Sequence, residues 1–144
     1  MKIRPIPPQP IPTTDVLVAR LKQCNDLVQT YYKARQDHNV QAAHSARLGI
    51  SLFVPCGVYK RADVESEEHF AVYGVIRSST KLVSAERLFV VPIIPVREVS
   101  QVGSFAGKWS TMPLVDTDGF LVPVCRDGAP YRPRFQRVGE IVHF

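Results

Sequence analysis

The sequence contains no local motif that specifies an enzymatic chemistry. It has no G-x-S-x-G nucleophile motif, no phosphate-binding loop and no G-x-G-x-x-G dinucleotide motif. The four histidines and three cysteines are scattered and show no metal-ligand spacing. Asp116-Thr-Asp-Gly119 resembles the start of a calcium loop, but Phe120 and Leu121 stand where such a loop needs an oxygen ligand and a glycine. We therefore expect no enzyme, no cofactor and no metal site.

Cysteine is scarce, and long apolar runs are absent. The three cysteines, Cys24, Cys56 and Cys125, include no C-x-x-C pair and are odd in number. This pattern argues against a disulfide framework and favours a reducing compartment. The longest apolar run, residues 88–96, is interrupted by two prolines, and a membrane helix needs roughly 20 apolar residues. We expect no membrane span.

Composition places the chain among ordinary globular proteins. Its 144 residues suit one domain, and 45% of them are hydrophobic, which is enough to bury a core. The net charge is +5 and the isoelectric point is about 9.3. A moderately basic balance permits contact with nucleic acid or with an acidic protein, and it establishes neither of them.

Proline is concentrated at the N-terminus, where five of the 12 prolines lie within the first 14 residues. Proline lacks the backbone N–H and fixes φ, so this stretch predicts an extended, polyproline-like arm over residues 1–14. Such an arm stays ordered only when it lies on a surface, either of its own domain or of a neighbour. We expect it to bind a partner through its isoleucines and prolines, namely Ile3, Pro5, Ile6, Pro7, Pro8, Pro10, Ile11 and Pro12.

The next segment, residues 15–48, predicts one long or broken amphipathic helix. No glycine or proline occurs in it, and Thr14 or Asp15 can serve as the N-cap. Apolar residues recur at steps of four and three and form a face that could dock on another surface. This face consists of Leu17, Leu21, Cys24, Val28 and Tyr31. Residues 37–39 are a possible break, so residues 40–48 form either a second, shorter helix or a continuation of the first, and we expect a stop at Gly49.

From residue 49 to residue 144 the pattern changes to short β segments with turn signals. The expected strand pieces are 50–54, 57–60, 69–77, 87–91, 108–115, 120–125 and 134–144. Asp118-Gly119 and Asp127-Gly128 predict hairpin turns, and the prolines at residues 92 and 95 predict an edge strand or a bulge. The chain is therefore expected to be α+β, with a mostly antiparallel small β-barrel or β-sandwich of about six strands following the arm and the helix.

An arginine-rich segment near the C-terminus could contact phosphates and stack on bases. Its candidate residues are Arg126, Tyr131, Arg132, Arg134, Phe135 and Arg137. The same alternation also fits a half-buried edge strand with a solvated arginine face, which we favour, or arginines that pair with carboxylates of an adjacent subunit.

These features predict a non-enzymatic structural protein of a large assembly. A stiff arm, a long helix and a compact β domain suit a subunit that straps its neighbours, and phage virions contain such subunits. We therefore expect a capsid cement, decoration or head–tail joining protein, located in the virion, that contacts copies of itself or a major capsid protein. The alternative is an RNA-binding component of a cytoplasmic ribonucleoprotein that uses the arginine-rich segment.

Overall fold

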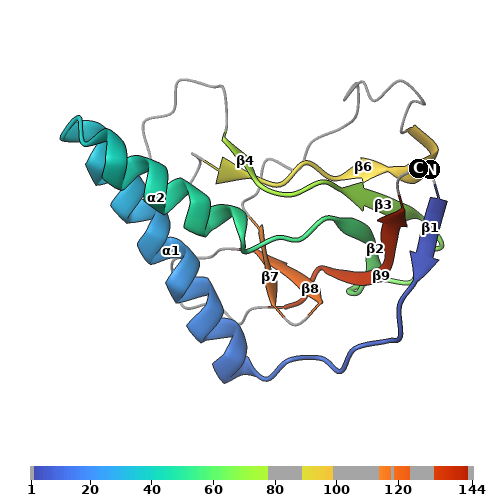
Figure 1. Cartoon of the computed structure of the whole chain (residues 1–144). Helices are drawn as coiled ribbons and strands as arrows, with labels where there is room; N and C mark the ends of the chain where they lie inside the picture. The colour runs from blue at the N-terminus through green and yellow to red at the C-terminus, as the bar shows by residue number, and fades with distance from the viewer. Residues whose placement is uncertain (1, 78–88, 99–113, 118, 124–131, 143–144) are drawn as a thin grey trace.

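A computed structural model describes residues 2–77, 89–98, 114–117, 119–123 and 132–142 of the chain. In these residues a helical hairpin packs at one end of a mostly antiparallel sheet (Figure 1). The helices are α1 (Thr14–Gln36) and α2 (Val40–Ser51), with a short 3-10 helix, η2 (Val96–Glu98). The strands are β1 (Lys2–Pro5), β2 (Gly57–Arg61), β3 (His69–Val72), β4 (Ile76–Arg77), β5 (Phe89–Val90), β6 (Ile94–Pro95), β7 (Leu114–Thr117), β8 (Phe120–Pro123) and β9 (Phe135–Val142).

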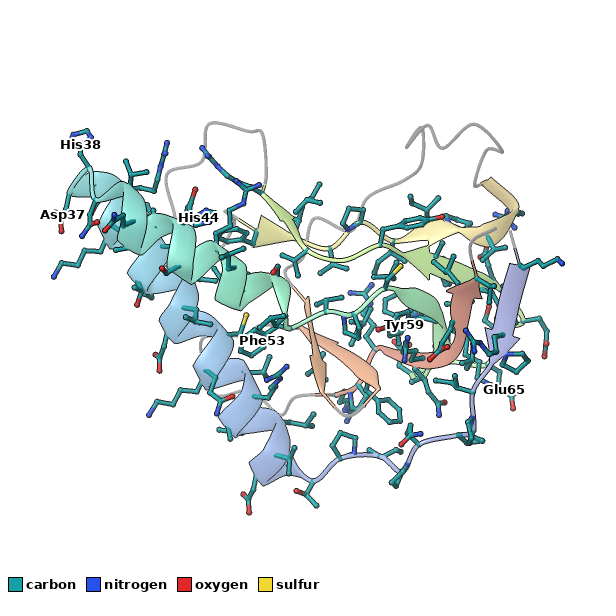
Figure 2. All side chains as sticks on the ribbon, viewed as in Figure 1. Asp37, His38, His44, Phe53, Tyr59 and Glu65 are labelled. Atoms are coloured by element: carbon teal, nitrogen blue, oxygen red, sulfur yellow. The ribbon has the colours of Figure 1, made fainter. Side chains whose placement is uncertain are left out.

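The helix is broken at residues 37–39, a point that the sequence left open. His38 has a φ of 55°, in the left-handed region, and it lies at the tip of the hairpin (Figure 2). The side chain of Asn39 then caps α2 by accepting a hydrogen bond from the Ala42 N–H at 3.1 Å. The predicted cap of α1 is wrong, because Thr13 rather than Thr14 or Asp15 occupies that position.

The predicted stop at Gly49 is also wrong, because α2 continues to Ser51. Gly49 instead lies inside the helix where α2 passes close to α1. A Cβ at this position would be 3.1 Å from Cδ1 of Leu27, so the missing side chain permits the close approach. The expected strand at residues 50–54 is wrong as well, because Ile50 and Ser51 continue α2 and residues 52–54 form no strand.

The predicted apolar face of α1 is present, and it packs against other parts of the same chain. All five residues of the face are buried in one cluster with Ala43, Ala46 and Ile50 of α2 and with Phe89, Phe120 and Val122 of the sheet strands. Tyr31 meets the Phe89 ring edge-on, with ring centroids 5.0 Å apart. In this fold the face is therefore part of the internal core and is not available to an outside partner.

The β segments form a mostly antiparallel sheet, as expected, but the sheet is open, which corrects the barrel form of the expected small β-barrel or β-sandwich. The strand order is β6-β3-β2-β9-β8-β7, and β1 adds to β9. The expected strand 69–77 is split in two, since Gly74 has a φ of 120° that bends the chain between β3 and β4. Strand β4 pairs with β5 in a separate two-stranded ribbon. The sheet does not close within the described residues, where β6 is a two-residue strand that ends one side of it.

Several expected strand positions are confirmed. Strand β2 and strand β9 lie where 57–60 and 134–144 were expected, and β7 and β8 form an antiparallel pair in which Thr117 is opposite Phe120. The proline-containing segment after residue 92 forms β6 at the sheet edge, as expected for a strand with proline. The Asp127-Gly128 turn and residues 108–113 fall outside the described residues.

Strand β9 is the centre of this sheet because three other strands pair with it. Strand β2 lies along one side, with Arg61 opposite Phe135. On the other side, β8 pairs with the beginning of β9 and β1 pairs with its end. Gly119 O accepts from the N–H of Arg137 at 2.7 Å, and the Ile6 N–H donates to Val138 O at 3.1 Å. The β7–β8 hairpin and β1 thus lie end to end on one edge of β9.

Replacing Gly139 with alanine should weaken the docking of β1. A Cβ at residue 139 would lie 2.6 Å from Cγ2 of Ile3 and 3.1 Å from the carbonyl oxygen of Arg4. We expect a loss of about 1–3 kcal/mol of unfolding free energy in urea denaturation and faster amide exchange at Ile6. The double variant Ile3→Ala/Gly139→Ala removes one of the two clashes and should recover part of the loss. Unchanged exchange at Ile6 in Gly139→Ala would contradict the pairing.

Candidate assembly interface

The N-terminal segment begins as a strand of the chain's own sheet. Strand β1 runs antiparallel to β9, with Lys2 opposite Val142 and Pro5 opposite Gly139. Arg4 faces Glu140 across the pair, and its Nε lies 3.3 Å from the Glu140 carboxylate. Both side chains are well exposed, so this ion pair contributes little energy and mainly favours one register.

The proline at the end of β1 occupies a position that suits a residue without an N–H. The Ile6 N–H donates to Val138 O, and donors alternate along an antiparallel ladder. The backbone nitrogen of Pro5 therefore points away from β9 and no ladder bond is lost. Ile3 is two residues from Pro5, so their side chains lie on the same face of β1. The side chain of Ile3 there covers the Cα of Gly139. This fit makes the register specific.

Residues 6–13 connect β1 to α1 without regular secondary structure. They cross the molecule from the outer end of the sheet to the start of the helical hairpin (Figure 1). Most of this segment is exposed, with Ile11 at 73%. Gln9 lies beside the β7–β8 turn, since a Cβ on Gly119 would be 3.2 Å from its Cγ. The expected arm of residues 1–14 therefore has two parts, a paired strand and an exposed proline-rich connector.

A groove of about 590 Å³ lies between β1 and the residues at the start of β3 and in η2. One wall is apolar and consists of Ile3 and Pro5 from β1 with Val138 from β9. The other wall is charged, where Nη2 of Arg97 lies 3.0 Å from Oε1 of Glu68. Glu67, His69 and Val96 complete the lining. Because β1 supplies part of the apolar wall, the shape of this groove depends on β1 being in place.

The arginine-rich segment is used in part by the fold itself. The guanidinium of Arg137 donates from Nη2 to the carbonyl oxygen of Cys56 at 2.9 Å. Gly57 makes room for it, since a Cβ there would lie 2.6 Å from Nε of Arg137. Phe135 is buried, with its ring 5.4 Å from Phe70, centroid to centroid, in an edge-on contact. These two residues therefore hold β9 to its neighbours.

The remaining candidates in that segment are placed differently. The guanidinium carbon of Arg134 lies 6.0 Å from the Phe135 ring, and the Arg134 N–H donates to Leu121 O at 2.8 Å. Arg132 is exposed. Arg126 and Tyr131 lie outside the described residues. Of the two aromatic rings proposed for base stacking, Phe135 is inside the core and cannot take that role as placed.

Sequence reasoning missed the pairing of the two chain ends. The signal was present in the alternation of charged and apolar residues at Lys2, Ile3 and Arg4, which matches Glu140 and Ile141 in charge and size. The five prolines between residues 5 and 12 are instead typical of an extended arm without strand pairing. The second missed feature is the pair of glycines, Gly57 and Gly139, whose role appears only when the strands are side by side.

Other sites that could carry chemistry are not assembled by the described residues. Among them, no group of three or more histidine, cysteine, aspartate or glutamate side chains could hold a metal ion. Neither α1 nor α2 has the length and apolarity that a membrane-crossing helix requires, within the part of the chain that the structure describes. No protein-family model, curated protein or solved structure was found to match this chain.

Replacing Arg137 with alanine should destabilise the fold, since it removes a charged donor from the Cys56 carbonyl. We expect a loss of about 1–2 kcal/mol in urea unfolding, near the low end for hydrogen bonds to charged groups because the side chain is half-buried. Arg132→Ala is the matched control, and this exposed position should change stability by less than about 0.5 kcal/mol. Equal effects of the two substitutions would show that Arg137 has no special structural role.

The two described cysteines should differ sharply in reactivity. Burial raises the pKa of the Cys24 thiol to about 11, whereas Cys56 is exposed. In a Cys125→Ser background at pH 8, maleimide should label Cys56 in the native protein and Cys24 only after unfolding. The buried thiol also favours the fold below its ordinary pKa of 9.0, and this contribution should be lost as the pH rises toward 11. Cys24→Ala should reduce that alkaline loss, and rapid native labelling of Cys24 would contradict its burial.

Proposed function

We propose that this chain is a non-enzymatic structural subunit of a large assembly whose N-terminal segment connects neighbouring subunits. The assembly we favour is a phage virion, with the chain as a capsid cement, decoration or head–tail joining protein. The observation that carries the proposal is the attachment of β1. This strand fits β9 in one register, yet an exposed proline-rich connector is all that joins it covalently to the helices.

The connector has the physical properties of a strap. Four prolines within residues 6–13 restrict its unfolded conformations, so it loses little entropy when it lies on a surface. At about 3.1 Å per residue, eight residues in a polyproline conformation span about 25 Å. That length is comparable with a small domain, so the connector can carry β1 from one subunit to the next.

A second surface supports a role in assembly. Val40 and Leu48 on α2 and Leu52, the residue that caps its end, are 78%, 55% and 77% exposed. Leu48 and Leu52 are four residues apart and therefore lie on one side at the end of the helix. Exposed apolar residues grouped in this way are typical of contact surfaces between proteins. The partners we propose are copies of the same chain, a major capsid protein, or both.

The placement of the arginines gives less support to RNA binding. Arg137 is engaged with the Cys56 carbonyl, and Arg61 is paired with Asp63, where Nη2 and Oδ2 are 2.6 Å apart. An RNA complex held by the remaining basic residues would weaken steeply with added salt. We therefore keep RNA binding as an outcome that the test of assembly can reveal.

Deleting residues 2–12 should abolish assembly while leaving the helical hairpin and the rest of the sheet folded. Sedimentation velocity should show concentration-dependent species larger than the 16.1 kDa monomer for the full chain, and only monomer for the deletion. Circular dichroism should show that the deletion retains its helices. In particles of the virus that encodes the chain, mass spectrometry should find it at a fixed copy number.

The matched control keeps the composition of β1 and reverses the order of residues 2–5. Reversal puts proline at position 2, whose N–H would face β9, and it removes the isoleucine that packs over Gly139. This variant should assemble as poorly as the deletion. A full chain that stays monomeric at every concentration and is absent from particles would refute the proposal, and salt-sensitive RNA binding would favour the alternative.

A further inference from the structure

We infer that β1 is an exchangeable strand, and that residues 2–5 of one copy add to β9 of a second copy of this chain. The inference rests on the proposed role in assembly and names its contact surface and its partner. The donor is the first strand of the chain, and the acceptor is the edge of β9 at residues 138–142. The antiparallel register in the exchanged pair is the one that the single chain displays.

The acceptor edge is shaped for a strand of this sequence. Strand β8 pairs with the first residues of β9 on this edge. The pairing ends at the hydrogen bond that the Arg137 N–H donates to Gly119 O. The edge from Val138 onward is then open for another strand, and Gly139 leaves the space that Ile3 fills. Glu140 supplies the complementary charge for Arg4. Without β1, this stretch of β9 would present unpaired backbone groups to any strand that approached it.

The donor strand is held to its own body by few interactions. All four residues of β1 are exposed, and Ile3, the one that fills a space, is still 39% accessible. The ladder bonds, the Ile3–Gly139 fit and the Arg4–Glu140 pair are formed between β1 and β9. Each of them can form equally well with the β9 of another copy, because exchange of an identical element between protomers preserves its contacts.

Because the connector is stiffened by proline, the protein concentration decides whether β1 pairs with β9 of its own chain or with β9 of another copy. A chain that holds its own β1 must keep residues 6–13 on one fixed path across its surface. A stiff connector supplies a high effective concentration of the strand only at the distances that it spans well. Exchange costs association entropy in dilute solution, and crowding of subunits in an assembly lowers that cost. We therefore place exchange in the assembled state and self-pairing in the dilute monomer.

Two singly substituted chains test this directly. Ile3 and Ile141 are opposite each other in a position of the ladder without mutual hydrogen bonds, where the Cα atoms of an antiparallel pair are about 4.5 Å apart. That separation suits a disulfide. Chains carrying Ile3→Cys are mixed with chains carrying Ile141→Cys, in a Cys56→Ser/Cys125→Ser background that keeps the buried Cys24. The mixture is equilibrated in a glutathione buffer up to millimolar protein and separated on a non-reducing gel.

We expect a mixed covalent dimer that grows with protein concentration. The Arg4→Cys chain is the control donor, since its side chain points to the opposite face of the strand from Ile141, and it should give at least tenfold less dimer. Adding Gly139→Ala to the Ile141→Cys chain should reduce the dimer as well, because the added Cβ would lie 3.1 Å from the Arg4 carbonyl oxygen of the donor strand. The double variant Ile3→Cys/Ile141→Cys in one chain should instead close an internal disulfide in dilute solution.

The outcomes separate this inference from the proposed function. If the mixture gives no dimer at any concentration while the double variant closes internally, β1 stays on its own body and exchange is wrong. If the Arg4→Cys donor reacts as well as the Ile3→Cys donor, contacts are nonspecific and exchange is equally wrong. In either case the unmodified chain could still sediment as a large assembly, which would leave the structural role standing with another contact surface.

Discussion

Pairing along strand β9 is the constraint on which the rest of the structure depends. This one strand receives β2 on one side and both β8 and β1 on the other. Its partners come from the start, the middle and the later part of the chain, so β9 joins the β6-β3-β2 part of the sheet to β8, β7 and β1. The helical hairpin then covers the part of the sheet near β8, where Phe120 and Val122 join its core. Residues 2–5 and 139–142, which are far apart in the sequence, are thus brought together in one strand pair.

Close packing around β9 requires two positions without a side chain. Gly139 lets Ile3 lie against the strand from one side, and Gly57 lets the Arg137 guanidinium reach the Cys56 carbonyl from the other. The register also shifts between Val58 and Tyr59, opposite Val138. Such a bulge increases local twist and changes the direction in which side chains point. The same small region therefore sets the docking of β1 and one wall of the adjacent groove.

The features that could be predicted are those encoded in short stretches of sequence. The apolar period of α1, the break before Asn39, the β7–β8 turn and the edge position of Pro95 each follow from a local pattern, and the structure contains all four. The missed features depend on residues far apart in the chain. Pro5 looked like part of an unpaired arm because only the ladder to Gly139 shows that its missing N–H faces outward. Gly49 looked like a helix stop because its contact with Leu27 is not visible in sequence.

The groove beside β1 can be formed by one chain or by two, depending on which chain supplies β1. Ile3 and Pro5 form its apolar wall, whereas Val138, Glu68 and Arg97 come from the body of the sheet. When β1 belongs to a neighbouring copy, the groove is built from two chains and exists only where they meet. Its charged wall, with Arg97 and Glu68 paired, is the same in either arrangement. The free monomer forms the same groove with its own first strand, so the groove is complete in either arrangement only while a β1 strand occupies the edge of β9.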